Sequence, residues 1–203
     1  TSVRSTPAAA TGAVFAVVLT VAAGDGSSMS TTQHVAATVA LTLLIPFTVY
    51  VGATLRARAA NATDLWLATT AVAAGAVGTC MKLLSDAPEI ARSDSQISSG
   101  GQTSAALEAV AGATTVLALI PLALFALAVG AAALRTGALP RWLAGGALVT
   151  GAGLAVNGCF LHTENVPALL VLALWCLLVS IRLVRVARRG EVSAGPVSAT
   201  SRA

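Results

Sequence analysis

Long apolar runs alternate with short polar segments along the chain. A helix needs about 20 apolar residues to cross the hydrocarbon core of a bilayer, and most of these runs reach that length. The pattern predicts an all-α fold, with a polytopic bundle of transmembrane helices over residues 1–189 and a disordered cytoplasmic tail over 190–203. The six predicted spans cover about residues 8–24, 35–55, 65–84, 105–134, 142–161 and 166–187.

The first run is the shortest of the six and has two interpretations. It can be a retained span, followed by an ordinary loop that starts at Asp25-Gly26. It can also be a cleaved signal peptide, with Arg4 as its basic segment and Val21-Ala22-Ala23 as its cleavage site. The loop signal favours the retained span, and the signal peptide stays open as the alternative.

The composition argues against a soluble domain. Hydrophobic residues make up 56% of the chain and charged residues only 10%, whereas soluble domains carry about 25% charged residues. The expected partner is therefore the lipid bilayer, with another membrane protein as a further candidate. The formal charge of +4 would suit nucleic acid, but the basic residues follow the membrane topology, so no nucleic-acid partner is predicted.

The basic residues are distributed unequally between alternate connections. With the N-terminus in the cytoplasm, ten of the 12 Lys and Arg residues fall inside, and Lys82 and Arg92 fall outside. This bias matches the positive-inside rule. It predicts a multi-pass protein of the plasma membrane with both ends in the cytoplasm. The predicted cytoplasmic residues are Arg4, Arg56, Arg58, Arg135, Arg141, Arg182, Arg185, Arg188, Arg189 and Arg202.

The connections and the glycines predict how the helices end and pack. Residues 85–104 are rich in Ser and Gly and are expected to form an exposed outer loop. Trp66 and Trp142 lie at the cytoplasmic ends of their helices, where interfacial anchoring explains them without a ligand. Glycines of the third and fifth spans are expected to form close-packing faces. They are Gly75, Gly78, Gly145, Gly146, Gly151, Gly153 and Gly158.

Helices two and three resemble helices four and five, which suggests a parallel internal repeat. Leu44-Ile45-Pro46 corresponds to Leu119-Ile120-Pro121, and Trp66-Leu67-Ala68 corresponds to Trp142-Leu143-Ala144. Parallel repeats in membrane proteins are related by an axis along the membrane normal. The alternative is chance alignment, because helices rich in Ala, Leu and Val resemble one another.

The repeat would make two pairs of residues equivalent. Pro46 and Pro121 each remove a backbone hydrogen bond and are expected to kink their helices. Cys80 and Cys159 fall at similar depth in the outer half of the membrane. They could face each other unbonded, or form a disulfide if their Cα atoms lie about 4.4–6.8 Å apart. The alternative is that both are ordinary small apolar residues.

Ionisable and polar residues gather at the predicted outer ends of the helices, where they form a candidate outer polar cluster. One interpretation is a set of side chains solvated at the interface, and the other is an outward-facing vestibule. Lys82 and Asp86 are spaced i, i+4 and can pair. The members of the cluster are His34, Lys82, Asp86, Glu108, Asn157, His162 and Glu164.

Two histidines and a glutamate in this cluster could bind a divalent metal ion. They lie in separate segments without the HExxH spacing, and haem would need two axial ligands that the pattern does not suggest. No metal and no cofactor are therefore predicted.

The turn between the fourth and fifth spans reads Arg135-Thr136-Gly137-Ala138-Leu139-Pro140-Arg141-Trp142. This arginine-flanked turn, together with the six-span layout, resembles a family of uncharacterised actinobacterial integral membrane proteins grouped as a domain of unknown function. The resemblance covers most of the chain and implies a six-helix fold in the plasma membrane. It implies no catalytic residues.

Three functions fit the sequence. A non-enzymatic accessory, assembly or sensor-partner module is favoured, because the chain lacks GxSxG, P-loop and Rossmann motifs and has no acidic metal motif. A small-solute transporter or channel is the alternative, supported by the possible repeat and the prolines. A membrane redox or metal-binding protein that uses the outer polar cluster is the second alternative.

The predicted topology can be tested by cysteine labelling from outside the cell. In a cysteine-free background, an impermeant maleimide should label a cysteine placed within residues 85–104 and miss one placed at Ala138, because the arginine bias puts Ala138 in the cytoplasm. Labelling of position 138 in intact cells would contradict the topology.

Overall fold

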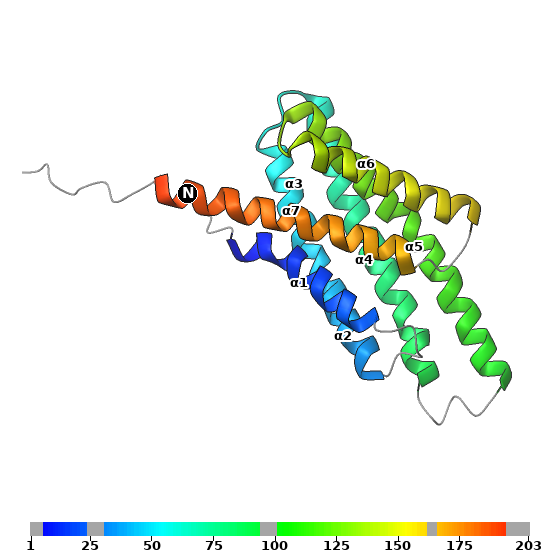
Figure 1. Cartoon of the computed structure of the whole chain (residues 1–203). Coiled ribbons are helices and arrows are strands. Elements are labelled where there is room, and N and C mark those ends of the chain that lie inside the picture. Colours follow the sequence, from blue (N-terminus) through cyan, green and yellow to red (C-terminus); the bar gives the residue numbers. More distant parts are fainter. Residues whose placement is uncertain (1–5, 24–30, 94–100, 162–165, 194–203) are drawn as a thin grey trace, which may run out of the picture.

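The computed structural model of the chain describes residues 6–23, 31–93, 101–161 and 166–193. Within these ranges every regular element is a helix (Figure 1). The elements are α1 (Thr6–Ala23), α2 (Thr31–Thr42), α3 (Leu44–Arg56), α4 (Ala62–Ser93), α5 (Gly101–Thr136), α6 (Arg141–Val156), the π-helix η1 (Asn157–Leu161) and α7 (Val166–Ser193).

The helices have the length and composition of membrane spans. Helix α1 is apolar over Ala9–Val21 but is shorter than the others. The predicted all-helical fold is confirmed, with five to six helices that could span a membrane. The five longer candidates are Val35–Arg56, Ala62–Pro88, Gly101–Thr136, Arg141–Leu161 and Leu169–Ala187.

Helix α5 lies between α4 and α6 and carries much of the buried surface. Helices α4 and α5 run antiparallel as the longest pair (Figure 1). A Cβ atom built on Gly78 of α4 would lie 2.8 Å from Leu122 Cγ of α5, and one built on Gly75 would lie 2.6 Å from Thr48 Cγ2 of α3. These two glycines therefore form the close-packing face that the sequence predicted, because any larger side chain would push the helices apart.

The contact between α5 and α6 also depends on glycine. A Cβ atom on Gly151 would lie 2.7 Å from Leu127 Cγ, and one on Gly130 would lie 2.8 Å from Leu148 Cδ2. Gly145 and Gly153, on the same helix as Gly151, have no atom within 4 Å of such a Cβ. The prediction that all the glycines of this span pack closely is therefore only partly right.

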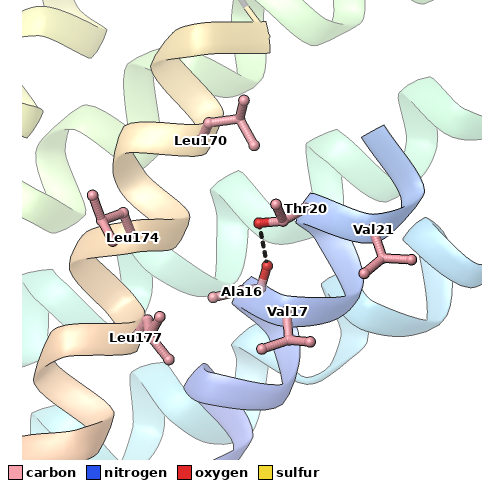
Figure 2. Close-up of a pocket in the computed structure, with 7 residues that line it drawn as sticks. All are labelled: Ala16, Val17, Thr20, Val21, Leu170, Leu174 and Leu177. Carbon is pink, nitrogen blue, oxygen red and sulfur yellow. Dashed lines mark hydrogen bonds between the residues drawn. The ribbon is translucent and has the colours of Figure 1, made fainter. Parts of the chain in front are cut away.

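Helices α1 and α7 form a second antiparallel pair. Gly12 of α1 packs against Ser180 of α7 and Phe47 of α3, and Phe15 of α1 is buried in the core. An apolar groove of about 470 Å³ runs along the pair, between Ala16, Val17, Thr20 and Val21 of α1 and Leu170, Leu174 and Leu177 of α7 (Figure 2). Helix α1 is thus packed into the bundle, which suits a retained span.

Apart from Lys82, which lies toward the other end, the described basic residues gather at one end of the bundle, which we call the arginine end. It contains the α3–α4 and α5–α6 connections and the C-terminal half of α7, since Arg58, Gly137 and Arg182 line one pocket there. The opposite end contains the C-terminal turns of α4 and the N-terminal turns of α5.

The predicted outer loop is much shorter than expected. Helix α4 continues to Ser93 with Pro88 inside it, and α5 starts at Gly101. Residues 85–93 and 101–104 of the predicted loop are therefore helical, and residues 94–100 lie outside the described residues. The reason is burial, because Ser85 and Asp86 pack inside the bundle and not in water. Hydrogen bonds within the turn from Lys82 to Asp86 help to hold the helix there.

The two prolines of the proposed repeat differ in effect. The helix is interrupted at Leu43, between α2 and α3, where Pro46 has no N–H to donate to the Thr42 carbonyl. Helix α5 continues without interruption through Pro121. Thr42 and Pro46 are both exposed on the surface of the bundle, so this interruption does not line a buried polar site.

The packing of α6 predicts a contrast between two of its glycines. Gly151→Leu should lower the free energy of unfolding in detergent by about 1–3 kcal/mol, because the added side chain overlaps Leu127. Gly153→Leu is the matched control and should leave the stability unchanged or slightly higher, since leucine favours the helix by up to about 1 kcal/mol. Equal losses of thermal stability in both variants would contradict this packing.

Candidate functional site

A polar cluster lies near the opposite end of the bundle, within α4. Lys82 Nζ is 2.8 Å from Asp86 Oδ1 and 2.9 Å from Ser85 Oγ. Ser85 Oγ in turn donates to the Lys82 carbonyl at 2.7 Å. The i, i+4 spacing therefore places an ammonium and a carboxylate in direct contact.

Helix α2 completes this cluster. Thr38 Oγ1 donates to Asp86 Oδ2 at 3.1 Å, so both carboxylate oxygens of Asp86 accept a hydrogen bond. Asp86 is only 6% exposed. A buried carboxylate is tolerated when it is paired and hydrogen-bonded, and this one links α2 to α4. We call Thr38, Lys82, Ser85 and Asp86 the Lys82 cluster.

The other predicted members of the outer polar cluster do not join the Lys82 cluster where they are described. Glu108 is exposed on α5. Asn157 is buried in the widened turn of η1, and no Cα atom of η1 lies within 8 Å of one in α4. Helix α5 therefore separates Asn157 from Lys82 and Asp86, which the alignment of the spans by depth did not predict.

The metal-binding interpretation depends on residues that the structure does not describe in full. The side chain of His34 and the whole of His162 and Glu164 lie outside the described residues. Among the residues that are described, no group of three His, Cys, Asp or Glu side chains could hold a metal ion. The predicted approach of His34, Glu108 and His162 stays a prediction.

The two repeat-related cysteines are separated. Cys80, Cys159 and Cys176 are free thiols. Because the α4 and η1 Cα atoms are all more than 8 Å apart, Cys80 and Cys159 exceed the disulfide range of about 4.4–6.8 Å. The predicted disulfide is therefore wrong, and so is the predicted facing pair. Similar depth placed the cysteines at one level, but α5 lies between their helices.

The arginine end contains an ion pair that the sequence did not identify as a site. Arg135 Nε of α5 lies 2.7 Å from Asp64 Oδ1 at the start of α4. The backbone N–H of Asp64 donates to Asn61 Oδ1 at 3.0 Å, and Ala60 N–H donates to Asp64 Oδ2 at 3.3 Å. The signal was present, because Asn61 and Asp64 have the spacing of a capping box.

Two further arginines bind neighbouring helices at this end. Arg58 Nη1 donates to the Gly137 carbonyl at 3.0 Å, and Arg56 Nη2 donates to Thr69 Oγ1 at 3.2 Å. Gly137 has a φ of +65°, which glycine adopts without strain at the end of a helix. The turn after α5 is thus shaped so that its carbonyl accepts from Arg58.

Polar groups in the middle of the bundle are mostly satisfied by backbone. Trp175 Nε1 of α7 donates to the Leu143 carbonyl of α6 at 3.0 Å, and its ring packs edge-on against Phe125 with 6.1 Å between centroids. Thr48 and Thr79 are buried and donate to carbonyls of their own helices. Among the described residues, the Ser180 hydroxyl is buried without a partner. These contacts support a structural role for the interior.

Comparison with known proteins gives no match. No protein-family model matches the chain, and neither a curated protein nor a solved structure matches it. Its function is therefore inferred from its own geometry.

The Lys82 cluster predicts energetic coupling between its two charged residues. Asp86→Leu should destabilise the bundle by about 1–3 kcal/mol, because Lys82, whose side chain is 17% exposed, loses its partner. The Lys82→Met/Asp86→Leu double variant should lose much less than the sum of the single variants, since apolar groups can replace a buried pair. Thermal unfolding of all four proteins measures the coupling, and additivity within about 0.5 kcal/mol would contradict the pairing.

Proposed function

We propose that the chain is a non-enzymatic accessory module of the plasma membrane that binds a transmembrane helix of another membrane protein. In this proposal it crosses the bilayer six times, with both ends and the arginine end in the cytoplasm. The arginine bias of the sequence supports that orientation. The exposed positions of Trp66 and Trp142 at the arginine end also suit a membrane interface there.

The outward face of α6 carries the proposal. A Cβ atom built on Gly145 or Gly153 would meet nothing within 4 Å, and Val149, between them on the same face, is 75% exposed. The spacing i, i+4, i+8 aligns the three residues along one side of the helix. The result is a flat strip on the surface of the bundle, bounded by small residues.

Glycine at these positions needs an explanation outside the chain. Each glycine in a helix interior costs about 1 kcal/mol relative to alanine, and packing within the chain offsets that cost at Gly151 but not at Gly145 or Gly153. Small residues in membrane helices allow a second backbone to approach closely. A helix of a partner protein that packs on Val149 would approach the α6 backbone closely at both Gly145 and Gly153.

The paired interior also supports a non-catalytic role. Lys82 and Asp86 bind each other, and Asp64 binds Arg135. A catalytic acid or base needs access to a substrate proton, whereas these groups link α2 to α4 and α4 to α5. Their contacts are those of residues that hold helices together.

A small-solute transporter is the second candidate, and the Lys82 cluster favours it. Ionisable residues inside membrane spans commonly mark substrate or ion pathways, and Lys82 and Asp86 lie within the candidate span Ala62–Pro88. Solute flux in proteoliposomes that is lost in Lys82→Met/Asp86→Leu, although the variant stays folded, would favour this candidate over the accessory module.

Site-specific photo-crosslinking in native membranes tests the accessory proposal. A photoreactive phenylalanine at Val149 should give one discrete crosslinked product with another membrane protein. The same probe at Ala113, on an exposed face of α5, is the matched control and should give none. Adding Gly145→Leu and Gly153→Leu should abolish the product without loss of thermal stability, because both positions are open.

Two results would contradict the proposal. Crosslinking of position 149 to lipid alone would show that no partner helix binds at this face. A crosslinked product of twice the mass of the chain would show that the face binds a second copy of the chain and not another protein.

A further inference from the structure

A pocket of about 330 Å³ lies at the arginine end, between three parts of the chain. Its walls are Thr54 of α3, Arg58 of the α3–α4 connection, residues 137–140 of the α5–α6 turn, and Arg182, Leu183 and Val186 of α7. We propose that this pocket binds the phosphate headgroup of an anionic phospholipid. The proposal is independent of the partner face on α6.

The described lining of the pocket is positively charged. Arg58 and Arg182 both line it, and none of its described lining residues is acidic. Asp64, the carboxylate at this end of α4, is engaged by Arg135. Two guanidinium groups on one pocket favour an anion, and phosphate accepts paired hydrogen bonds from the planar fork of an arginine.

The two arginines have different roles. Arg58 is held in place, because its Nη1 donates to the Gly137 carbonyl at 3.0 Å while its other N–H groups remain available. In the described part of the chain, Arg182 makes no hydrogen bond and no ion pair. One arginine is therefore pre-oriented by the turn, and the other is free to close on a ligand.

The turn that forms one wall is well defined. Gly137, at a φ of +65°, ends α5, and its N–H donates to the Ala133 carbonyl at 2.9 Å. Leu139 is buried, and Pro140 directly precedes the first turn of α6. The amino end of a helix carries partial positive charge, so this wall adds to the field of the arginines.

The surroundings of the pocket favour a lipid over a soluble phosphate. Trp66 and Trp142, which are 64% and 62% exposed, lie in the first turns of α4 and α6 at the same end. Exposed tryptophans of this kind sit at the headgroup level of a bilayer. Val186 of α7 lines the pocket beside the arginines and is 44% exposed, so an acyl chain can follow this outer face of α7 while the phosphate meets the guanidinium groups. Basic pockets between membrane helices bind such headgroups.

Native mass spectrometry of the full chain tests the proposal. The purified protein is titrated with phosphatidylglycerol, with phosphatidylcholine, and in a separate arm with inorganic phosphate. The wild type should retain phosphatidylglycerol at least about tenfold more tightly than phosphatidylcholine, because one charge-assisted hydrogen bond alone corresponds to about that factor. Inorganic phosphate should neither bind nor displace the lipid at millimolar concentration.

Arg182→Gln is the decisive variant, because Arg182 makes no bond that the fold needs. It should reduce retention of phosphatidylglycerol about tenfold, and the matched control Arg185→Gln, one turn along α7 and outside the pocket lining, should not. Arg58→Gln should give a similar loss, with thermal unfolding as its check on folding.

Three outcomes would overturn the inference. Equal retention of the two lipids by the wild type would show that the pocket does not select an anionic headgroup. Equal losses in Arg182→Gln and Arg185→Gln would show a diffuse basic surface in place of a pocket. Binding of inorganic phosphate as tight as that of the lipid would identify a soluble phosphate as the ligand.

Discussion

Helices in a bilayer gain nothing from hiding leucine or valine from their surroundings, because lipid tails are equally apolar. What holds them together is close approach, and close approach needs small side chains at the contacts. In this bundle the contacts converge on α5. Gly78 lets α4 reach the backbone of Leu122, and Gly151 lets α6 reach the backbone of Leu127, since a Cβ atom added to these glycines would lie 3.0 and 2.9 Å from the respective leucine nitrogen. The positions of α4 and α6 beside α5 depend on these two contacts, while α1 and α7 pack against each other.

Polar links complement this packing at the two ends of the bundle. The Asp64–Arg135 pair joins α4 to α5 at the arginine end, and the Thr38–Asp86–Lys82 contacts join α2 to α4 at the other. Because these groups satisfy one another, the surfaces left for binding lie elsewhere. Two such surfaces are the open strip on α6 and the pocket lined by Arg58 and Arg182. We propose that the first binds a helix of another membrane protein and the second an anionic headgroup.

Much of this fold could be predicted from the sequence, but the lateral order of the helices could not. The length of each apolar run predicts a membrane span, and the i, i+4 spacing predicts that Lys82 lies beside Asp86. Depth along a helix follows from residue count, and it put Cys80 and Cys159 at one level. Depth does not reveal that α5 lies between their helices. Nearly uniform Ala/Leu/Val faces also do not indicate which helices pack side by side. For the same reason Gly151 and Gly153 look alike in the sequence, although one is packed and the other open. The capped Asn61–Asp64 turn was detectable, since its spacing alone marks a helix start.

The position of α5 between α4 and α6 can be measured by disulfide crosslinking in membranes. Gly158→Cys with Leu119→Cys, in a background without native cysteines, should oxidise readily to an intramolecular disulfide, because a Cβ atom built on Gly158 of η1 would lie 3.3 Å from Leu119 Cβ of α5, close to the Cβ–Cβ spacing of a disulfide. A protein that keeps only Cys80 and Cys159 should not, because no Cα atom of η1 lies within 8 Å of α4. Efficient oxidation of Cys80 with Cys159, together with failure of the engineered pair, would contradict this arrangement of the bundle.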